Sequence, residues 1–269
     1  MKLDTNTQLC ISIAAKPSDF GVAVHNAAYE AEGLNFLYFP FSATLESLER
    51  MIQGVRDFGI RGCSVSMPFK SQVIQYLDEV DEVAREIGAV NTIVNTDGRL
   101  KGYNTDYTGA FEVLPALEGK KVLMLGAGGV AAAIGRAVKD KGGELYISNR
   151  NNGKAQTLAS KLSAQVVGWG ERESFEAFML INATSVGMQS EEMPVSESAL
   201  DNFEQVYDVI IDPLRSSLIK AAESIGMVAY PGSAMCIGQA AAQFKLYTGR
   251  DAPVEVMRRT VVGMLGGSK

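Results

Sequence analysis

Histidine, cysteine and tryptophan are scarce in this chain of 269 residues, which has one, three and one of them respectively. A Ser-His-Asp hydrolase or a multi-histidine metal centre needs more histidine than His25 alone can supply. Cys10, Cys63 and Cys236 are odd in number and far apart, which is typical of free thiols in a reducing cytoplasm and not of a disulfide framework or a zinc site. We therefore expect no metal, and any catalysis must use other groups.

An excess of basic residues and long apolar runs are also missing. The 31 acidic residues outnumber the 25 lysines and arginines, giving a net charge of −6, so we expect no nucleic-acid partner and no anionic membrane surface. The first 15 residues lack the apolar stretch of a secretory signal, and no window of about 18 uncharged apolar residues occurs. We expect a cytoplasmic protein without membrane spans. Its 46% hydrophobic composition is typical of one or two globular domains with a substantial core.

Apolar runs of strand length alternate with helical stretches along the chain. Strands alternating with helices of about 10–15 residues indicate an α/β fold with parallel sheets and crossover helices. A second strand–helix series restarts after residue 104, which predicts a domain boundary there. The expected strands are 8–14, 35–41, 62–65, 89–95, 121–126, 144–150, 164–169, 178–185, 206–212 and 227–231. The expected helices are 20–32, 42–59 (with Ser42 or Thr44 as N-cap), 80–88, 105–119, 129–139 and 153–161, and one after each of the last two strands.

One glycine-rich stretch directly follows a short apolar run. In KKVLMLGAGGVAAAIGRAV, the strand expected at 122–125 leads into a turn and then into a helix of small residues. Gly126 allows the tight turn, Gly128 lets the backbone approach a pyrophosphate, and Ala131 allows close helix–strand packing. A turn that serves packing alone is the alternative. The complete strand–turn–helix context favours dinucleotide binding by Gly126, Ala127, Gly128, Gly129, Val130 and Ala131.

The end of the next expected strand indicates which dinucleotide is bound. NAD-binding units usually carry Asp or Glu about 20 residues after the glycines, where it bonds the ribose 2′-hydroxyl. This chain has Asn149 and Arg150 there, with Lys154 one turn later. A guanidinium can bind a 2′-phosphate through two hydrogen bonds, whereas an acid would repel it. We therefore predict NADP rather than NAD, with a solvated basic loop as the alternative.

Small and hydroxylic residues follow a later strand, in INATSVGM. The backbone of a turn at Thr184 and Ser185 can lie against the ribose of a nicotinamide. Alone, the same residues are equally typical of a simple Ser/Thr turn.

Two charged residues stand out among apolar and small neighbours: Lys70 in SVSMPFKSQV and Asp106 in GYNTDYTG. Taken singly, Lys70 is typical of a surface lysine and Asp106 of a helix N-cap. A hydride transfer to or from an alcohol carbon, however, needs a group that moves the hydroxyl proton. With His25 as the sole histidine, a lysine is the natural candidate, and a carboxylate beside it would hold the ammonium in place.

These motifs together resemble the shikimate dehydrogenase family over essentially the whole chain. The resemblance rests on SVSMPFK, IGAVNTIVN with GYNTD, GAGGVA, NRNNGKA, INATSVGM and GSAMCIGQAAAQFKLYTG, in family order and spacing. It implies a substrate domain at 1–104, a Rossmann-type NADP domain at 105–238, and C-terminal helices at 239–269 that return to the first domain. It also implies reversible reduction of 3-dehydroshikimate with NADPH in the cleft between the domains.

The resemblance also implies roles for individual residues. Lys70 corresponds to the family's catalytic lysine and Asp106 to its partner. The hydroxyl of Ser66 stands where the family usually has a substrate-binding threonine. Asn91 and Gln239 correspond to residues that bond the ring hydroxyls of the substrate. The positions expected toward the cofactor beyond the glycine turn and the basic cluster are Glu82, Thr184, Ser185, Val209 and Gly232.

Two departures from the family pattern predict altered substrate recognition. The family's Ser-x-Ser pair for the substrate carboxylate is reduced to Ser18, followed by Asp19, which would repel a carboxylate, although Lys16 could attract one. Ile211 replaces a tyrosine that faces the substrate, and losing such a phenol typically costs about 0.5–1.5 kcal/mol of binding. This pattern resembles the shikimate-dehydrogenase-like branch of the family. We expect weak turnover of shikimate, or turnover of a related cyclic hydroxy acid.

Other functions remain open from the sequence. A ligand sensor of the same fold with little turnover, a quinate-type dehydrogenase and a folate-linked NADP dehydrogenase are the alternatives. The retained Lys70 and Asp106 disfavour the sensor, because a pure binder needs no proton shuttle. NTDYTG and GQAAAQF disfavour the folate-linked type. The expected partner is a small-molecule substrate, and the expected state is a monomer or a homodimer.

Overall fold

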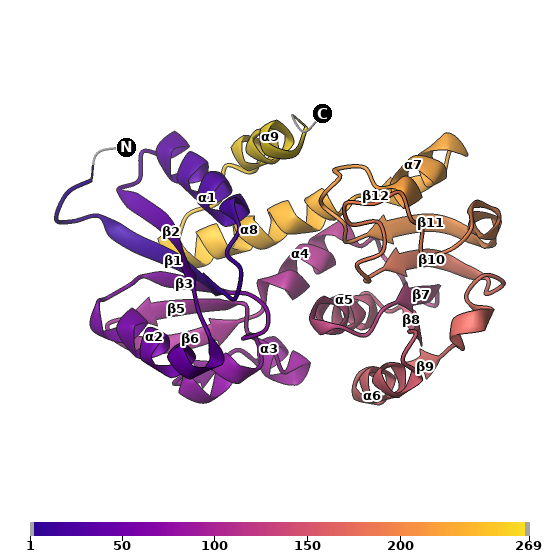
Figure 1. Ribbon diagram of the computed structural model, residues 1–269, viewed down its shortest axis with the longest axis horizontal. Coiled ribbons are helices and arrows are strands. Elements are labelled where there is room, and N and C mark those ends of the chain that lie inside the picture. The colour runs from indigo at the N-terminus through magenta and orange to yellow at the C-terminus, as the bar shows by residue number, and fades with distance from the viewer. Residues whose placement is uncertain (1–2, 267–269) are drawn as a thin grey trace. The chain divides into compact units, whose positions relative to one another are not determined.

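The computed structural model describes residues 3–266, which form two compact units (Figure 1). Within this range, the first unit comprises residues 3–105 and 237–266, and the second comprises Asp106–Cys236. Among the described helices, none is long and apolar enough to cross a membrane.

The first unit is built on a six-stranded sheet in the order β2-β1-β3-β5-β6-β4. This sheet is mixed, because β5 runs antiparallel to both β3 and β6. The prediction of parallel sheets is therefore wrong for this half of the molecule, and the short strands β4 and β6 were not predicted. The strands are β1 (Gln8–Ala14), β2 (Phe36–Ser42), β3 (Gly62–Val65), β4 (Glu79–Val80), β5 (Thr92–Thr96) and β6 (Arg99–Tyr103).

Helices cover both faces of this sheet (Figure 1). The side chains of α2 form an apolar core with one face of β1, β3 and β5. On the other face, α8 lies so close to β3 that a Cβ atom on Gly62 would come within 2.3 Å of the Tyr247 ring. The helical elements are α1 (Asp19–Ala31), α2 (Leu45–Asp57), η1 (Gln72–Tyr76), α3 (Glu82–Ile87), α8 (Gly232–Thr248, which begins in the second unit) and α9 (Val254–Leu265).

The second unit is a parallel six-stranded sheet in the order β12-β11-β10-β7-β8-β9. Numbered from β7, this is the 3-2-1-4-5-6 order of a Rossmann fold, whose direction of winding reverses between β7 and β10. The strands are β7 (Lys121–Leu125), β8 (Glu144–Ser148), β9 (Gln165–Val166), β10 (Ala177–Asn182), β11 (Phe203–Asp208) and β12 (Val228–Tyr230). The helical elements are α4 (Thr105–Val113), α5 (Gly129–Asp140), α6 (Asn152–Leu162), η2 (Trp169–Glu171), η3 (Glu197–Asn202) and α7 (Ser217–Ser224).

The central strands of this sheet, β7 and β10, are buried on both faces over most of their length. Along β7, Val122 and Met124 pack with α4, α5 and α6, whereas Leu123 and Leu125 pack with η3 and α7. Helices on both sides explain why β7 reads as a continuous apolar run instead of an alternating one.

Several element ends differ from the prediction for local reasons. The helix expected at 105–119 ends at Val113, because Pro115 has no N–H and disfavours helix before it. It begins at Thr105, so Asp106 lies in its first turn and is not its N-cap.

The strand expected to reach residue 212 ends at Asp208, whose carboxylate accepts the N–H of Ile210. The strand expected at 164–169 is only β9, and η2 replaces its end. Of the two predicted caps of α2, Thr44 is the one observed.

Candidate functional site

The glycine-rich turn joins β7 to α5 at the point where the sheet reverses its winding. Gly126 has φ of +114°, and a Cβ atom there would lie 2.6 Å from the carbonyl oxygen of Ala183. The turn after β7 can therefore approach the turn after β10 only with glycine at this position. A Cβ atom on Gly128 or Gly129 would meet nothing within 4 Å, so the space over the start of α5 is open. Gly128 has no side chain that could cap α5, which leaves the helix N–H groups facing this space.

A pocket of about 350 Å³ lies over this turn, which we call the switch-point pocket. It is formed at the carboxyl ends of β7, β8, β9 and β10, where open α/β sheets bind their ligands. A neighbouring hollow of about 620 Å³ shares four of its residues and continues along α6. The switch-point pocket is lined by Gly126, Ala127, Gly128, Asn149, Arg150, Asn151, Lys154, Trp169, Ala183, Thr184, Ser185 and Val186.

The rim of the switch-point pocket is basic. Arg150 and Lys154 are both exposed, and neither forms an ion pair with another residue among 3–266. The loop that carries them is fixed by neutral amides, since Asn149 Nδ2 donates to the carbonyl of Asn151 at 2.9 Å and Asn151 Oδ1 accepts the N–H of Lys154 at 3.0 Å. The described lining includes no acidic residue, so the rim can hold a dianionic phosphate without repulsion.

A buried polar group holds the turn after β10 in shape. The amide of Asn182 donates to Asp208 at 2.9 Å and to the carbonyl of Val186 at 3.1 Å, while its oxygen accepts the Thr184 hydroxyl at 2.6 Å. Burial raises the pKa of Asp208, and its hydrogen bonds from Ser216 and Asn182 oppose that rise. The positions of Thr184 and Ser185 are thus set by side chains beneath them.

Two other predicted cofactor positions lie in the same unit and one does not. The N–H of Val209 donates to the Asn182 carbonyl at 3.1 Å. Val209 is therefore hydrogen-bonded to the same residue whose side chain holds the turn after β10. A Cβ atom on Gly232 would lie 2.4 Å from the Ile210 carbonyl, so α8 can begin here only with glycine. Glu82, the first residue of α3, is exposed and belongs to the first unit.

In the first unit, Lys70 stands in the turn after β3. The preceding side chain, Phe69, is 1% exposed and anchors the turn in the core beside α2. The carbonyl of Lys70 accepts the N–H of Val90 at 2.8 Å, and the N–H of Val65 donates to the carbonyl of Asn91 at 2.8 Å. Lys70 and Asn91 are therefore held as neighbours by backbone bonds, and the side chain of Lys70 is half-buried.

Asn91 is 3% exposed and its amide has one defined orientation. Its Oδ1 accepts the backbone N–H of Thr105 at 2.7 Å, and it also bonds the hydroxyls of Thr105 at 3.1 Å and Thr92 at 2.9 Å. Its Nδ2 makes no hydrogen bond to any of the described residues. Asn91 can therefore offer a ligand only a donor, which suits a hydroxyl or carboxylate oxygen.

A second amide connects this cluster to α8. Gln243 Nε2 donates to the hydroxyls of Ser64 at 2.6 Å and Thr92 at 2.9 Å, so its Oε1 must accept from His25 Nε2, 3.1 Å away. His25 is thus the Nε2–H tautomer, and its Nδ1 is buried without a hydrogen-bond partner among residues 3–266. Burial lowers the pKa of His25 to about 4, despite the hydrogen bond to Gln243. The sole histidine is a neutral structural residue.

The remaining predicted substrate positions fall on the elements around this cluster. Gln239 precedes Gln243 by one turn of α8, and residues four apart lie on the same helix face. Ser18 is exposed at the N-cap of α1 and its hydroxyl does not cap that helix. Its loop is tied to the Ser66 turn, because the N–H of Ala15 donates to the Met67 carbonyl at 3.3 Å.

Asp106 is buried in the first turn of α4 and is assigned to the second unit. Asp106 directly follows Thr105, whose backbone N–H donates to Asn91 of the first unit. The Cα of Asp106 is therefore about 3.8 Å from the Cα of a residue that Asn91 holds in place.

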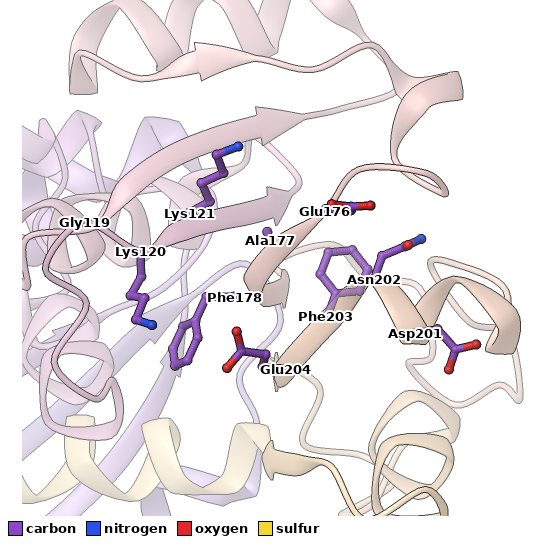
Figure 2. A pocket seen from close by; sticks show the side chains of 10 residues that line it. All are labelled: Gly119, Lys120, Lys121, Glu176, Ala177, Phe178, Asp201, Asn202, Phe203 and Glu204. Carbon is purple, nitrogen blue, oxygen red and sulfur yellow. The ribbon is translucent and has the colours of Figure 1, made fainter.

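Figure 2 shows another hollow of about 410 Å³, at the amino-terminal edge of the second sheet. Lys120 Nζ lies 4.8 Å from the centre of the Phe178 ring there, and Figure 2 shows the Glu204 carboxylate near the same ring. Its charged residues are exposed and of both signs, and it faces away from the carboxyl ends of the strands. This hollow therefore does not define a ligand.

Some residues of these sites were not predicted. Those in the switch-point pocket are Asn151, Trp169, Ala183 and Val186. Those around Asn91 are His25, Ser64, Thr92, Thr105 and Gln243. The position of Trp169 at the carboxyl end of the strand expected at 164–169 was an available signal, whereas the partners of Asn91 are distant in sequence and gave none.

Three family models match the chain in sequence order. The shikimate dehydrogenase substrate binding domain matches residues 20–93, shikimate / quinate 5-dehydrogenase matches 109–187, and the shikimate 5′-dehydrogenase C-terminal domain matches 232–262. The matches therefore extend over both units.

Known proteins resemble the chain over most of their lengths. A shikimate dehydrogenase-like protein of Haemophilus influenzae is 39% identical, covering 91% of this chain and 92% of its own. A shikimate dehydrogenase (NADP(+)) of Moorella thermoacetica is 40% identical, covering 91% of this chain and 89% of its own. The shikimate 5-dehydrogenase of Thermus thermophilus, solved with NADP(H) and shikimate, is 28% identical with a TM-score of 0.86, covering 94% of this chain and 98% of its own.

Proposed function

The chain belongs to the shikimate dehydrogenase family, and we propose that it is an NADP-dependent oxidoreductase that interconverts a hydroxyl and a ketone on a cyclic polyhydroxy acid. The reference pair for this reaction is shikimate and 3-dehydroshikimate. The cofactor assignment is supported by the relatives named for NADP and by the basic, acid-free rim of the switch-point pocket.

The observation that carries the proposal is that one chain contains the parts of both half-sites. The second unit has a glycine turn that leaves an open anion-binding space beside Arg150 and Lys154. The first unit has a half-buried lysine held next to an amide whose only free group is a donor. A pure binding protein has no need for an ionisable amine at that position.

Within this proposal, bound NADPH supplies the hydride for reduction of the ketone carbon. The N–H groups at the start of α5 hold the pyrophosphate, and Arg150 with Lys154 holds the 2′-phosphate. The Asn91 amide donates to a hydroxyl of the ring and Gln239 bonds another, which orients the ring. Lys70 delivers a proton to the ketone oxygen, and it takes the proton back in the reverse direction. Asp106 supplies the counter-charge that keeps the ammonium in position.

The identity of the substrate depends on the segment after β1. Ser18 has an exposed hydroxyl that no helix cap engages, and Asp19 next to it is an exposed acid. The negative charge of Asp19 disfavours the carboxylate of shikimate, and Ile211 offers no phenol to a ring hydroxyl. We therefore propose low efficiency with shikimate and better efficiency with a cyclic hydroxy acid that places its charge or its hydroxyls differently.

The proposal is tested with a panel of cyclic hydroxy acids, including shikimate and quinate, each assayed with NADP and with NAD. Reduction is followed by absorbance of the reduced cofactor, and Lys70→Ala serves as the control for contaminating dehydrogenases. We expect turnover with NADP for at least one acid of the panel. Tight binding of an acid without turnover of any member would instead support a ligand sensor.

A further inference from the structure

The single tryptophan of the chain lines the switch-point pocket, although no part of the dinucleotide motif requires an aromatic residue there. Trp169 begins η2, directly beyond the end of β9, and it is half-buried. In the β-strand order of this unit, β9 neighbours β8, whose end carries Arg150. The indole therefore stands on the same side of the pocket as the basic rim.

The indole is held in place by Arg172. The Arg172 guanidinium lies 4.3 Å from its ring centre, and Arg172 also donates to the carbonyl of Trp169 at 2.7 Å and of Pro194 at 3.0 Å. Glu173 pairs with Arg172 at 2.9 Å, and it accepts the N–H and hydroxyl of Ser196. These contacts fix the plane of the ring before any ligand arrives, so little side-chain entropy is lost on binding.

The position of the indole selects one part of the ligand. The glycine turn receives the pyrophosphate and the basic rim the 2′-phosphate, and the ribose of the adenosine links these two groups. The adenine is attached to C1′ of that ribose, next to the carbon that carries the 2′-phosphate, so it lies on the side of the basic rim. An aromatic ring in the lining of a pocket suits a purine, because every base has a π-face that can stack on an aromatic ring.

We infer that Trp169 is the adenine platform of this enzyme, and that it contributes to affinity for the dinucleotide without taking part in the chemistry. The inference rests on the proposed function, since it assumes that the switch-point pocket holds NADP. The inference predicts that Trp169, which belongs neither to the glycine turn nor to the basic rim, contributes to the binding free energy of NADP.

The first test uses the wild-type protein, in which all tryptophan fluorescence comes from Trp169. Adenosine 2′,5′-bisphosphate carries the adenine and the 2′-phosphate but no nicotinamide. Titration with this fragment should change the fluorescence to a saturating value, and nicotinamide mononucleotide should not.

The second test measures the affinity of variants for NADP by calorimetry. Trp169→Leu should weaken binding about tenfold or more, which corresponds to about 1.4 kcal/mol, whereas Trp169→Phe should retain most of it. The turnover number at saturating cofactor should stay within about twofold of wild type. Phe175→Leu is the matched control, because Phe175 packs against the same apolar cluster but does not line the pocket.

The outcomes separate this inference from the proposed function. If the wild type binds NADP and the bisphosphate without a change in fluorescence, and Trp169→Leu binds NADP equally tightly, Trp169 is no adenine platform and the proposed function still stands. If the wild type binds neither compound, the cofactor assignment itself is wrong and the inference falls with it.

Discussion

The candidate sites of the two units are built in different ways. In the first unit, Asn91 is positioned by a buried network of side chains that runs from Thr105 through Thr92 to Gln243 and His25. In the second unit, backbone forms the centre of the site, because Gly126 allows the close approach and the charged groups around it are exposed.

This difference indicates how each site discriminates between ligands. Buried hydrogen bonds have strict direction and are costly to leave unmade, so the first unit can distinguish hydroxyl patterns on a small ring. Water and salt screen the charge of exposed cations. The second unit can therefore discriminate a dinucleotide with a 2′-phosphate from one without it, but the difference in binding free energy is smaller. Changes to the buried network should therefore have larger effects than changes to the basic rim.

The largest effect is expected at Lys70, the group that we propose moves the hydroxyl proton. Lys70→Ala should lower turnover by about 10²–10⁴-fold, the usual range for a positioned acid–base group, and Asp106→Asn should also lower it. NADP affinity should hardly change, because the switch-point pocket belongs to the other unit. Steady-state kinetics with calorimetry of NADP binding measures both quantities.

A matched control for Lys70 is another half-buried lysine of the first unit. Lys101 pairs with Glu79 on neighbouring strands, away from the turn after β3. Lys101→Ala should keep turnover near wild type. Near-wild-type turnover in Lys70→Ala would make Lys70 a binding or surface lysine and refute the proposed mechanism.

The same contrast explains which features the sequence could predict. The glycine turn and Arg150 were predictable, because each motif fixes its own local backbone or stands at a fixed distance from it. The antiparallel pairing of β5 with β6 was not predictable in this way, since the alternation of strands and helices predicts one parallel strand at 89–95. The Gln243–Thr92 bond joins residues 151 positions apart, and no local pattern marks such a pair. Trp169 stood at the end of a predicted strand, and the structure has η2 at that end.

The next largest effect is expected from breaking the buried network. Gln243→Leu removes the partner of His25 Nε2 and the donor to Ser64 and Thr92. Because each buried group left without a partner costs about 1–3 kcal/mol, unfolding free energy should fall by roughly 3 kcal/mol. The Michaelis constant for the acid should rise more than turnover falls, because Asn91 loses the support of Thr92. Urea unfolding and steady-state kinetics measure these effects.

Gln53→Leu is the control for Gln243, since Gln53 is an exposed glutamine of the same unit that bonds only Asp57. Its unfolding free energy should stay within about 0.5 kcal/mol of wild type. Equal effects of the two changes would show that the buried network contributes nothing special to the fold or to Asn91.

A smaller effect is expected at the basic rim. The wild type should prefer NADP over NAD by at least about tenfold, or roughly 1.4 kcal/mol, and Arg150→Ala should narrow that gap. Because Arg150 is exposed, the preference should also shrink as salt is raised, whereas the effect of Gln243→Leu should not. Arg136→Ala, which removes an ion-paired arginine of α5 outside the pocket, is the control. Equal efficiency of the wild type with both cofactors would contradict the assignment.

The smallest effect is expected at the segment after β1. Asp19→Ser should lower the Michaelis constant for shikimate about two- to fivefold, because removing one exposed like charge is worth about 0.5–1 kcal/mol. Asp19 is also the acidic residue in the first turn of α1, so the change should cost a few tenths of a kcal/mol of stability. Glu46→Ser removes the equivalent first-turn acid from α2 and alters the net charge by the same amount. If both variants changed the constant equally, net charge would be the cause. If Asp19→Ser left it unchanged, the carboxylate would bind elsewhere, and the reason for altered substrate choice would have to be sought at Ile211.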